Sequence, residues 1–394
     1  MSLFMQTLPI FIPISYFALS VGAFFIATTV QSRYLLPFIL LPSYLSFRTA
    51  DHWPGDVSSL WGLLICIWVA HSTSFLWLED PEVWEETKRT HHGRIAKYIP
   101  VKYHRALKQW NNPRLLGTTR QSIPAYEYSP SIRRFTITRT AKLLAYCTAY
   151  TWGKTHIFPA WFMPIQFSEF DPSHQVYFRR LLSSSTPITP RETQMRAVFV
   201  LWWAFAAVSM LDAAHAALSL IAVPLLRLDT PSEWPPIFGL PSNAWSMRRF
   251  WGRFWHQIVV RPYKNHAKWL SRRIIGLRSG SGVDKVVVIF LIFLFSGVAH
   301  AGVAWQLGDH CGWGGDVWWF CMNFVAGAVE VVILKMVNIV MQRCGQKARW
   351  ERLRGGLLGR AFGYMWVFGF LFWSVPKWQY AKVYCHLQDV LEME

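Results

Sequence analysis

Long apolar runs separated by polar stretches dominate this chain of 394 residues. A helix needs about 20 mostly apolar residues to cross the hydrocarbon core of a bilayer. Eight runs approach that length: Leu8–Val30, Tyr34–Phe47, Val57–Leu78, Ala141–Met163, Met195–Leu226, Val286–Leu307, Val317–Met341 and Leu357–Val375. Because 53% of the residues are hydrophobic and such runs flank every polar stretch, we expect an all-α polytopic membrane protein with about eight spans. The same pattern favours one integral domain, residues 1–394, over separate soluble modules.

The first two runs need separate treatment. Leu8–Val30 has no basic segment before its apolar core and is long enough to span, so we expect a retained helix rather than a signal peptide. Tyr34–Phe47 is short, and Pro37 and Pro42 interrupt it. A span and a re-entrant segment both fit this second run, which leaves the count open by one.

Basic residues are concentrated between the apolar runs. The stretches 79–140, 227–285 and 343–360 are rich in Lys and Arg, whereas 308–316 contains neither. The positive-inside rule places the three basic loops in the cytoplasm, and eight spans then leave both termini on the lumenal side, most simply of the endoplasmic reticulum. The net charge is +18, but no motif that reads bases is visible. We therefore expect membrane lipids or an anionic cofactor, and no nucleic acid, as partners.

A segment rich in Trp and Arg stands out in the second basic loop. Trp234-Pro235-Pro236-Ile237-Phe238-Gly239 leads into Phe250-Trp251-Gly252-Arg253-Phe254-Trp255-His256-Gln257. Trp side chains favour the headgroup level, and Arg beside them can reach phosphates, so the segment predicts an amphipathic helix at the cytoplasmic interface. Ser246 is a plausible N-cap for that helix. An interfacial anchor without chemistry is the alternative.

One histidine lies inside a strongly apolar run. His300 is the only ionisable side chain between Val286 and Leu307. An imidazole in hydrocarbon is costly, and an intramembrane ionisable residue is by default a functional hypothesis. A neutral imidazole is also well matched to general-base chemistry near neutral pH. The alternative is a buried histidine that donates to a carbonyl of a neighbouring helix.

These motifs resemble the wax synthase-like branch of the membrane-bound O-acyltransferase family. The resemblance rests on the Pro-Pro-x-Phe-Gly lead-in, on Ser246 to Gln257, and on Phe295-Ser296-Gly297-Val298-Ala299-His300. It is strong from Trp234 to His300 and weaker at Trp110 to Thr118, which is similar to an Asn-x-Arg-x-x-Gly-Thr stretch of this group. In fungi, such proteins often act as acetyltransferases of terpenoid and meroterpenoid pathways.

The resemblance implies an acyl-CoA-dependent enzyme. By similarity, His300 is the active-site histidine and His256 the polar residue of the second signature. Acetyl-CoA is the implied acyl donor, and an apolar alcohol, a hydroxylated terpenoid or meroterpenoid, is the implied acceptor. His256 would orient substrate or stabilise the developing oxyanion, with Asn243 or Gln257 as weaker possibilities.

The phosphates of CoA need cations, which the cytoplasmic loops supply. The expected donor-binding residues lie in or just after the second signature: Trp251, Arg253, Trp255, Arg249, Arg261 and Lys264. Ordinary positive-inside charge explains these basic residues equally well.

Three further residues are candidates for substrate binding. Asp212 and His215 lie three apart on one face of the fifth run, either as a structural pair or lining a cavity. Ser296 is a small residue beside Gly297, which suits either close helix packing or a ligand against the backbone. The six cysteines lack the spacing of a zinc site, so no metal is expected.

Two other functions remain open. A long-chain acyl-CoA wax or sterol ester synthase would keep the fold and change the donor. A polytopic lipid or metabolite transporter would predict internal repeats with broken helices at matching positions, and none is visible in the sequence.

Overall fold

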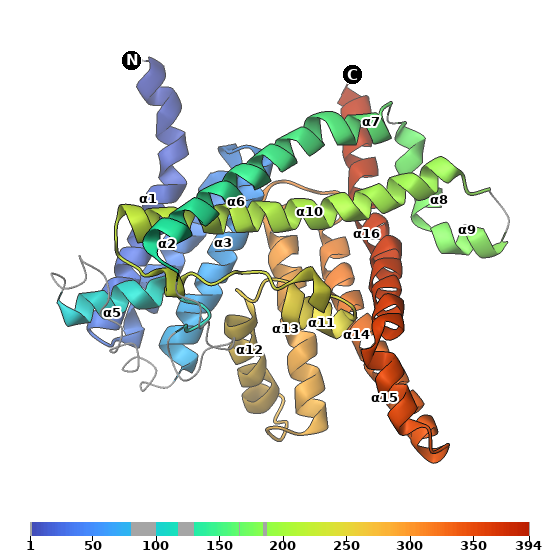
Figure 1. The fold of residues 1–394 in the computed structure, drawn as a ribbon. Coiled ribbons are helices and arrows are strands. Elements are labelled where there is room, and N and C mark those ends of the chain that lie inside the picture. The colour runs from blue at the N-terminus through green and yellow to red at the C-terminus, as the bar shows by residue number, and fades with distance from the viewer. Residues whose placement is uncertain (1, 80–99, 117–129, 165, 184–186, 394) are drawn as a thin grey trace. The chain divides into compact units, whose positions relative to one another are not determined.

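Every regular element that the structure describes is helical, which confirms the predicted all-α fold (Figure 1). In this computed structural model, the described residues are 2–79, 100–116, 130–164, 166–183 and 187–393. Much of the basic loop 79–140 lies outside them. The contacts divide the chain into two compact units: unit 1 comprises Met1–Ile132, Ile221–Pro235 and Gln257–Val317, and unit 2 comprises Arg133–Leu220, Pro236–His256 and Trp318–Glu394. One integral domain for 1–394 stays a prediction.

The chain is a multi-pass integral membrane protein. Five helices among the described residues are long and apolar enough to cross a membrane: Phe11–Thr29, Val57–Leu78, Pro190–Leu225, Gly282–Gln306 and Trp313–Arg343. A bent pair, Lys347–Gly355 with Leu357–Asp389, turns by 63° and would make six. These coincide with six of the eight predicted runs.

The remaining two predicted runs do not meet these criteria. The α2 helix (Leu36–Arg48) has 13 residues, so it reaches only about 20 Å along its axis. The run from 141 to 163 belongs to α6 (Ile132–Trp152), a π-helical turn η6 (Gly153–Ile157) and α7 (Phe158–Phe162), and α6 carries several Arg and Lys residues. Eight spans and the orientation inferred from them stay predictions.

Unit 1 is built from helices around an aromatic core. Its longer elements, besides α2, are α1 (Ser2–Thr29), α3 (Gly55–Thr73), α5 (Val101–Trp110), α12 (Val260–Trp269) and α13 (Gly282–Gln306). Phe24, Trp68 and Phe75 are buried in the core that α1, α2 and α3 share. Inside it, Trp68 Nε1 donates to Ser20 Oγ at 2.8 Å, and Ser20 and Ser43 hydroxyls lie 2.8 Å apart. These bonds satisfy polar groups that apolar surroundings would otherwise leave unpaired.

The start of α13 is fixed by its cap. Ser281 Oγ accepts from the Asp284 N–H at 3.1 Å. The Asp284 carboxylate accepts from Ser271 Oγ at 2.8 Å, from the Gly280 N–H at 2.8 Å and from Arg272 at 3.0 Å. The α12–α13 connection therefore has a defined geometry, and α13 packs along α12 through Val288 and Leu291.

Unit 2 contains the remaining helices. Its elements, besides α6 and α7, include α8 (Pro172–Gln175), α9 (Tyr177–Ser183), α10 (Pro190–Leu220), α11 (Met247–Arg249), a π-helical turn η11 (Phe250–Phe254), α15 (Lys347–Gly355) and α16 (Leu357–Met393), together with α14 (Trp313–Arg343) from Trp318 onward. Tryptophans form its centre: Trp203 stacks on Trp255 with ring centroids 5.5 Å apart, and Trp319 stacks on Trp378 at 4.3 Å. Such pairs add to the free energy gained from area burial alone.

Candidate active site

The second signature in unit 2 is a short helical segment braced by its own lead-in. The Gly239 N–H donates to the Phe254 carbonyl at 2.8 Å. A Cβ atom at Gly239 would overlap the Arg253 carbonyl oxygen. The Pro-Pro-x-Phe-Gly lead-in therefore ends in glycine because its backbone lies directly on the η11 turn.

The start of this segment is capped as the sequence predicts. Ser246 Oγ accepts from the Arg249 N–H at 3.2 Å, which confirms the N-cap. The buried Glu330 of α14 accepts from the Met247 N–H at 2.7 Å and from Trp366 Nε1 at 3.2 Å. The predicted helix extends through Gln257, but the helical part ends at Phe254, so the prediction was wrong for Trp255, His256 and Gln257.

His256 lies among aromatic rings with one ring nitrogen unused. Its ring lies edge to face with Phe238, with centroids 5.8 Å apart, and next to Trp255 at 5.9 Å. Its Nδ1 is buried and has no hydrogen-bond partner among the described residues. Burial lowers the pKa of His256 to about 4, because desolvation disfavours the charged imidazole. A neutral imidazole with a free nitrogen can donate or accept a hydrogen bond.

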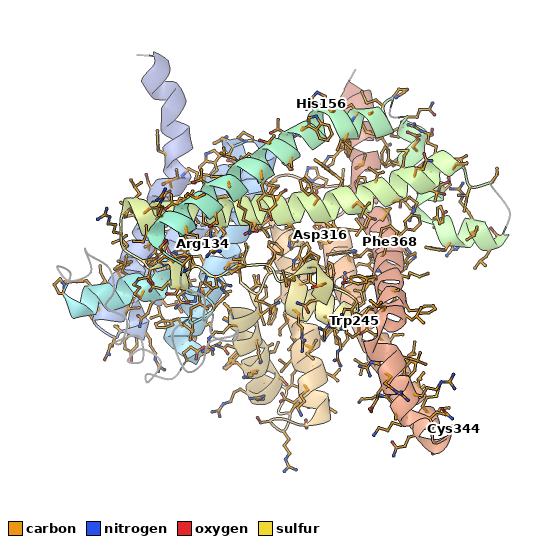
Figure 2. All side chains as sticks on the ribbon, in the orientation of Figure 1. Arg134, His156, Trp245, Asp316, Cys344 and Phe368 are labelled. Atoms are coloured by element: carbon orange, nitrogen blue, oxygen red, sulfur yellow. The ribbon has the colours of Figure 1, made fainter. Side chains whose placement is uncertain are left out.

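Arginines gather on the same segment and on α16. The Arg249 guanidinium lies 4.4 Å from the ring centroid of Trp245 and donates to Asn243 Oδ1 at 3.1 Å. Figure 2 labels Trp245 among the side chains of the protein. Burial, followed by the charges of Arg253 and Arg360, lowers the pKa of Arg249. None of these arginines pairs with a carboxylate in the described parts of the chain. Cations held together without an acid favour a polyanionic ligand.

Both tryptophans expected to bind donor have partners within the protein. Trp251 Nε1 donates to Asn323 Oδ1 at 3.1 Å. Trp255 is buried between Trp203 and Phe250, with centroids 5.5 and 5.4 Å away. Both residues hold the segment against α10 and α14, and a role in donor binding stays a prediction.

Asp212 and His215 each contact α6. Tyr146 donates to Asp212 Oδ2 at 3.1 Å, and Lys142 pairs with the same oxygen. Asp212 Oδ1 is buried without a hydrogen-bond partner among the described residues. One turn further along α10, His215 Nδ1 lies 3.4 Å from Arg139 Nη1. The polar face is thus shared between two helices, which the spacing of Asp212 and His215 alone did not indicate.

His300 belongs to unit 1 and lies in the unbroken helix α13. It is half-buried, with Gly297 and Ala301 buried on neighbouring positions. One turn on, Val303 approaches α3 so closely that a Cβ at Gly62 would lie 2.9 Å from Val303 Cγ2. The Ser296 hydroxyl donates to the Ile292 carbonyl at 3.0 Å, a bond within its own helix.

Two other expected donor-binding residues lie in α12 of unit 1. Arg261 Nη2 donates to Glu79 Oε1 at 2.6 Å, and Asn265 donates to the same oxygen. Lys264 is exposed. Burial, followed by the charges of Lys264 and Arg272, lowers the pKa of Lys268. Arg261 is therefore neutralised within the protein, whereas Lys264 is available to a ligand.

The weaker motif at 110–118 also has a structural partner in unit 1. The buried Arg114 donates to the Pro235 carbonyl at 3.4 Å. On α5, Lys108 pairs with Glu233 at 2.7 Å and with Asp229. These contacts hold the stretch 229–235 that precedes the signature, while Gly117 and Thr118 of the motif lie outside the described residues.

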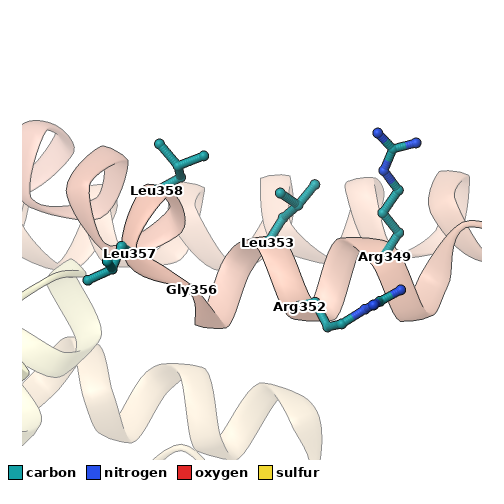
Figure 3. A pocket seen from close by; sticks show the side chains of 6 residues that line it. All are labelled: Arg349, Arg352, Leu353, Gly356, Leu357 and Leu358. Carbon is teal, nitrogen blue, oxygen red and sulfur yellow. The ribbon is translucent and has the colours of Figure 1, made fainter.

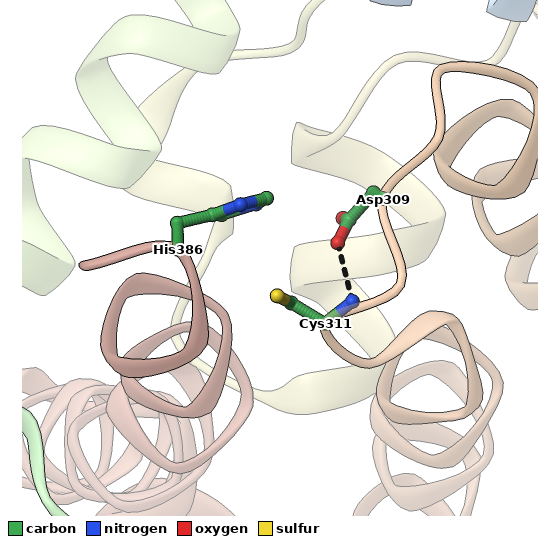
Figure 4. Close-up of side chains that lie close together, drawn as sticks. All are labelled: Asp309, Cys311 and His386. Carbon is green, nitrogen blue, oxygen red and sulfur yellow. Dashed lines mark hydrogen bonds between the residues drawn. The ribbon is translucent and has the colours of Figure 1, made fainter. Parts of the chain in front are cut away.

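The loop that follows α13 is tightened by a local hydrogen bond. The Cys311 N–H donates to Asp309 Oδ1 at 2.9 Å (Figure 4). This is an Asx-type turn, in which a short carboxylate side chain replaces a backbone acceptor.

The predicted site residues are thus divided between the two units. His256, Arg249, Arg253, Trp251, Trp255, Asp212 and His215 lie in unit 2, and His300, Ser296, Arg261 and Lys264 lie in unit 1. No sequence pattern indicated Arg360, which lies near Arg249, or Lys142 and Tyr146, which contact Asp212. Helical spacing cannot find such partners because they come from other helices.

Comparison with known proteins agrees with the sequence motifs. Residues 234–322 match the model of the membrane bound O-acyl transferase family, which confirms the predicted resemblance. The chain is 31% identical to the acetyltransferase ple2 of Rhodocybe pseudopiperita, over 53% of this chain and 52% of that protein. It is 31% identical to the acetyltransferase atnC of an Arthrinium species, over 47% and 40% respectively. The chain thus spans about half the length, or less, of these curated relatives. No solved structure matches the chain.

Proposed function

We propose that this chain is a membrane-bound O-acyltransferase that moves an acetyl group from acetyl-CoA to a hydroxyl of an apolar terpenoid or meroterpenoid. The observation that carries the proposal is the family match over 234–322, which includes both His256 and His300. The relatives named acetyltransferases support acetyl as the transferred group. The reaction joins the acceptor oxygen to the acetyl carbon, breaks the thioester bond and releases CoA as the thiol.

His300 is the general base in this proposal. As the acceptor oxygen attacks the thioester carbon, the imidazole takes the hydroxyl proton and then returns it to the departing thiolate. A half-buried imidazole on a membrane-length helix suits an acceptor that is itself apolar. Ser296, four residues earlier on the same helix face, contacts the acceptor in this scheme.

His256 acts on the developing oxyanion or orients the substrate. A neutral ring with an unpartnered, buried Nδ1 is ready to make one new hydrogen bond without losing an existing one. The unpartnered Asp212 Oδ1, with His215 nearby on α10, can likewise accept a hydrogen bond from a polar group of the acceptor.

The arginines around Arg249 bind the phosphates of CoA in this proposal. Arg249, Arg253 and Arg360 have no acidic partner among the described residues, so binding a polyanion relieves their mutual repulsion. The exposed Lys264 of unit 1 is a further proposed donor-binding residue. We propose the endoplasmic reticulum membrane as the location and the cytoplasm as the side of the basic loops, where acetyl-CoA is present.

Acetyl transfer in microsomes tests the proposal. Radiolabelled acetyl-CoA is offered with a panel of hydroxylated terpenoids and fatty alcohols, to membranes containing wild type or His300→Ala at matched levels. Label on a terpenoid with wild type alone supports the proposal. Full transfer by His300→Ala excludes His300 as the base, and preferential transfer from palmitoyl-CoA to fatty alcohols would assign a wax synthase instead.

A further inference from the structure

The bend between α15 and α16 carries a cavity that the proposed reaction does not use. The cavity measures about 470 Å³ and is lined by Arg349, Arg352, Leu353, Gly356, Leu357 and Leu358 (Figure 3). In this view Arg349, Leu353 and Leu358 point to one side of the two helices, whereas Arg352 and Leu357 point to the other side. The cavity therefore has a cationic end on α15 and an apolar end at the start of α16.

The two arginines have no partner inside the protein. Both are exposed, and neither guanidinium makes a hydrogen bond or ion pair with any described residue. Helical spacing puts Arg349, Arg352 and Leu353 on one face of α15, whereas Lys347, Glu351 and Arg354 share the opposite face. The face of α15 that lines the cavity thus carries two arginines and no acidic residue. The one carboxylate of α15, Glu351, lies on the opposite face.

The apolar end continues as a stripe along α16. Leu357 and Leu358 are 86% and 66% exposed, and Phe362 and Met365 are each 69% exposed. Leu358, Phe362 and Met365 follow one another at helical spacing, so they form a single strip that leads away from the arginines. Such a strip has the right chemistry to lie against a hydrocarbon chain.

The bend is a preformed feature of the fold. Trp350 Nε1 donates to Asn338 Oδ1 of α14 at 2.7 Å. This bond fixes the rotation of α15 about its own axis relative to α14. A Cβ at Gly359 would overlap the carbonyl oxygens of Leu353 and Arg354, so the two helices meet there backbone to backbone. The backbone positions that carry the two arginines and the leucines are therefore set before any ligand binds.

We propose that this bend binds an anionic glycerophospholipid, with the phosphate at the end of the cavity that Arg349 and Arg352 line and an acyl chain along Leu358, Phe362 and Met365. Two guanidinium groups match a phosphate in charge and in hydrogen-bond geometry. A free phosphate or CoA would contact the arginines but would leave the apolar strip of α16 exposed. A phospholipid contacts both the arginines and the strip, so the strip favours a lipid over these other anions.

The test measures ligand-induced thermal stabilisation of the purified full-length protein in detergent. The probes are dioctanoyl phosphatidic acid, dioctanoyl phosphatidylcholine, inorganic phosphate and CoA, each titrated against wild type, Arg349→Gln/Arg352→Gln and Lys347→Gln/Arg354→Gln. The last variant loses the same charge from the opposite face of α15 and serves as the matched control. Ligand that binds only the folded state raises the unfolding midpoint with concentration, which yields an apparent dissociation constant.

We expect phosphatidic acid to stabilise wild type and the control variant equally, and to bind Arg349→Gln/Arg352→Gln at least about tenfold more weakly. Phosphatidylcholine should stabilise all three proteins weakly and to the same extent. Equal weakening of phosphatidic acid binding in the two double variants would overturn the proposal. It would show that binding depends on the total positive charge of α15 and not on the face that carries Arg349 and Arg352. Stabilisation by inorganic phosphate or CoA as strong as that by phosphatidic acid, and lost in Arg349→Gln/Arg352→Gln, would overturn the assignment of a lipid.

Discussion

The two histidines proposed to act in the reaction are held by different kinds of structure. His300 lies in α13, an unbroken helix of 25 residues. His256 lies two residues after the η11 turn, and Phe238 and Trp255 flank its ring. One regular element therefore fixes the position of His300, whereas contacts between separate stretches fix that of His256. Changes in neighbouring residues should disturb His256 more readily than His300.

The largest effect is expected at His300. His300→Ala should lower kcat for acetyl transfer about 10²- to 10⁴-fold, the usual range for loss of a general base. His310→Ala, in the exposed loop after α13, is the matched control. Radiolabelled acetyl transfer in microsomes at equal protein levels measures both, and equal activity of the two variants would remove His300 from the mechanism.

A glycine pair tests whether backbone contact positions His256. Gly239→Ala should destabilise the protein by about 3 kcal/mol, because the new methyl group overlaps the Arg253 carbonyl and the turn must move. Gly252→Ala, where a Cβ meets nothing within 4 Å, should change the unfolding midpoint little. Thermal unfolding in detergent measures both variants. Similar midpoints would show that the lead-in does not brace the turn.

The pH dependence of stability is expected to report on His256. The pKa of His256 is lowered to about 4 in the folded protein, so the unfolded state binds more protons below pH 6.5. The contribution of His256 to the free energy of unfolding should therefore be fully present above pH 6.5. It should fall as the pH is lowered, by about 2 kcal/mol at pH 5. His256→Gln should make the curve less steep between pH 6.5 and 4. An unchanged slope in that variant would assign the dependence to other groups.

The smallest effect is expected from the arginine that α16 contributes. Arg360→Gln should raise KM for acetyl-CoA by about fivefold at most with kcat unchanged, since an exposed charge contributes about 1 kcal/mol or less to binding. Arg278→Gln, an exposed arginine of unit 1, should leave KM unchanged. Steady-state kinetics at low salt measures both. Equal KM values of Arg360→Gln and Arg278→Gln would show that Arg360 does not contribute to binding of acetyl-CoA.

Sequence reasoning worked where one helix carries the signal. The apolar runs located every membrane-length helix among the described residues, and Ser246 was correctly identified as an N-cap. Sequence reasoning was less successful where a site is built from contacts between several helices. The helix expected through Gln257 ends at Phe254, and the described contacts of Asp212 and His215 go to α6. Spacing along one helix shows which residues share a face, but not what that face meets.

The helical architecture and the place of His300 within a long apolar helix follow from the order of the amino acids alone. Backbone hydrogen bonds and hydrophobic burial of a helix depend on residues within a few turns, so both can be recognised locally. Tertiary contacts place Arg360 near enough to Arg249 to lower its pKa, lay Gly239 on the η11 turn, and leave a buried nitrogen of His256 without a hydrogen-bond partner among the described residues. Packing between elements brings together residues that are distant in the chain, and hydropathy and spacing carry no record of those contacts.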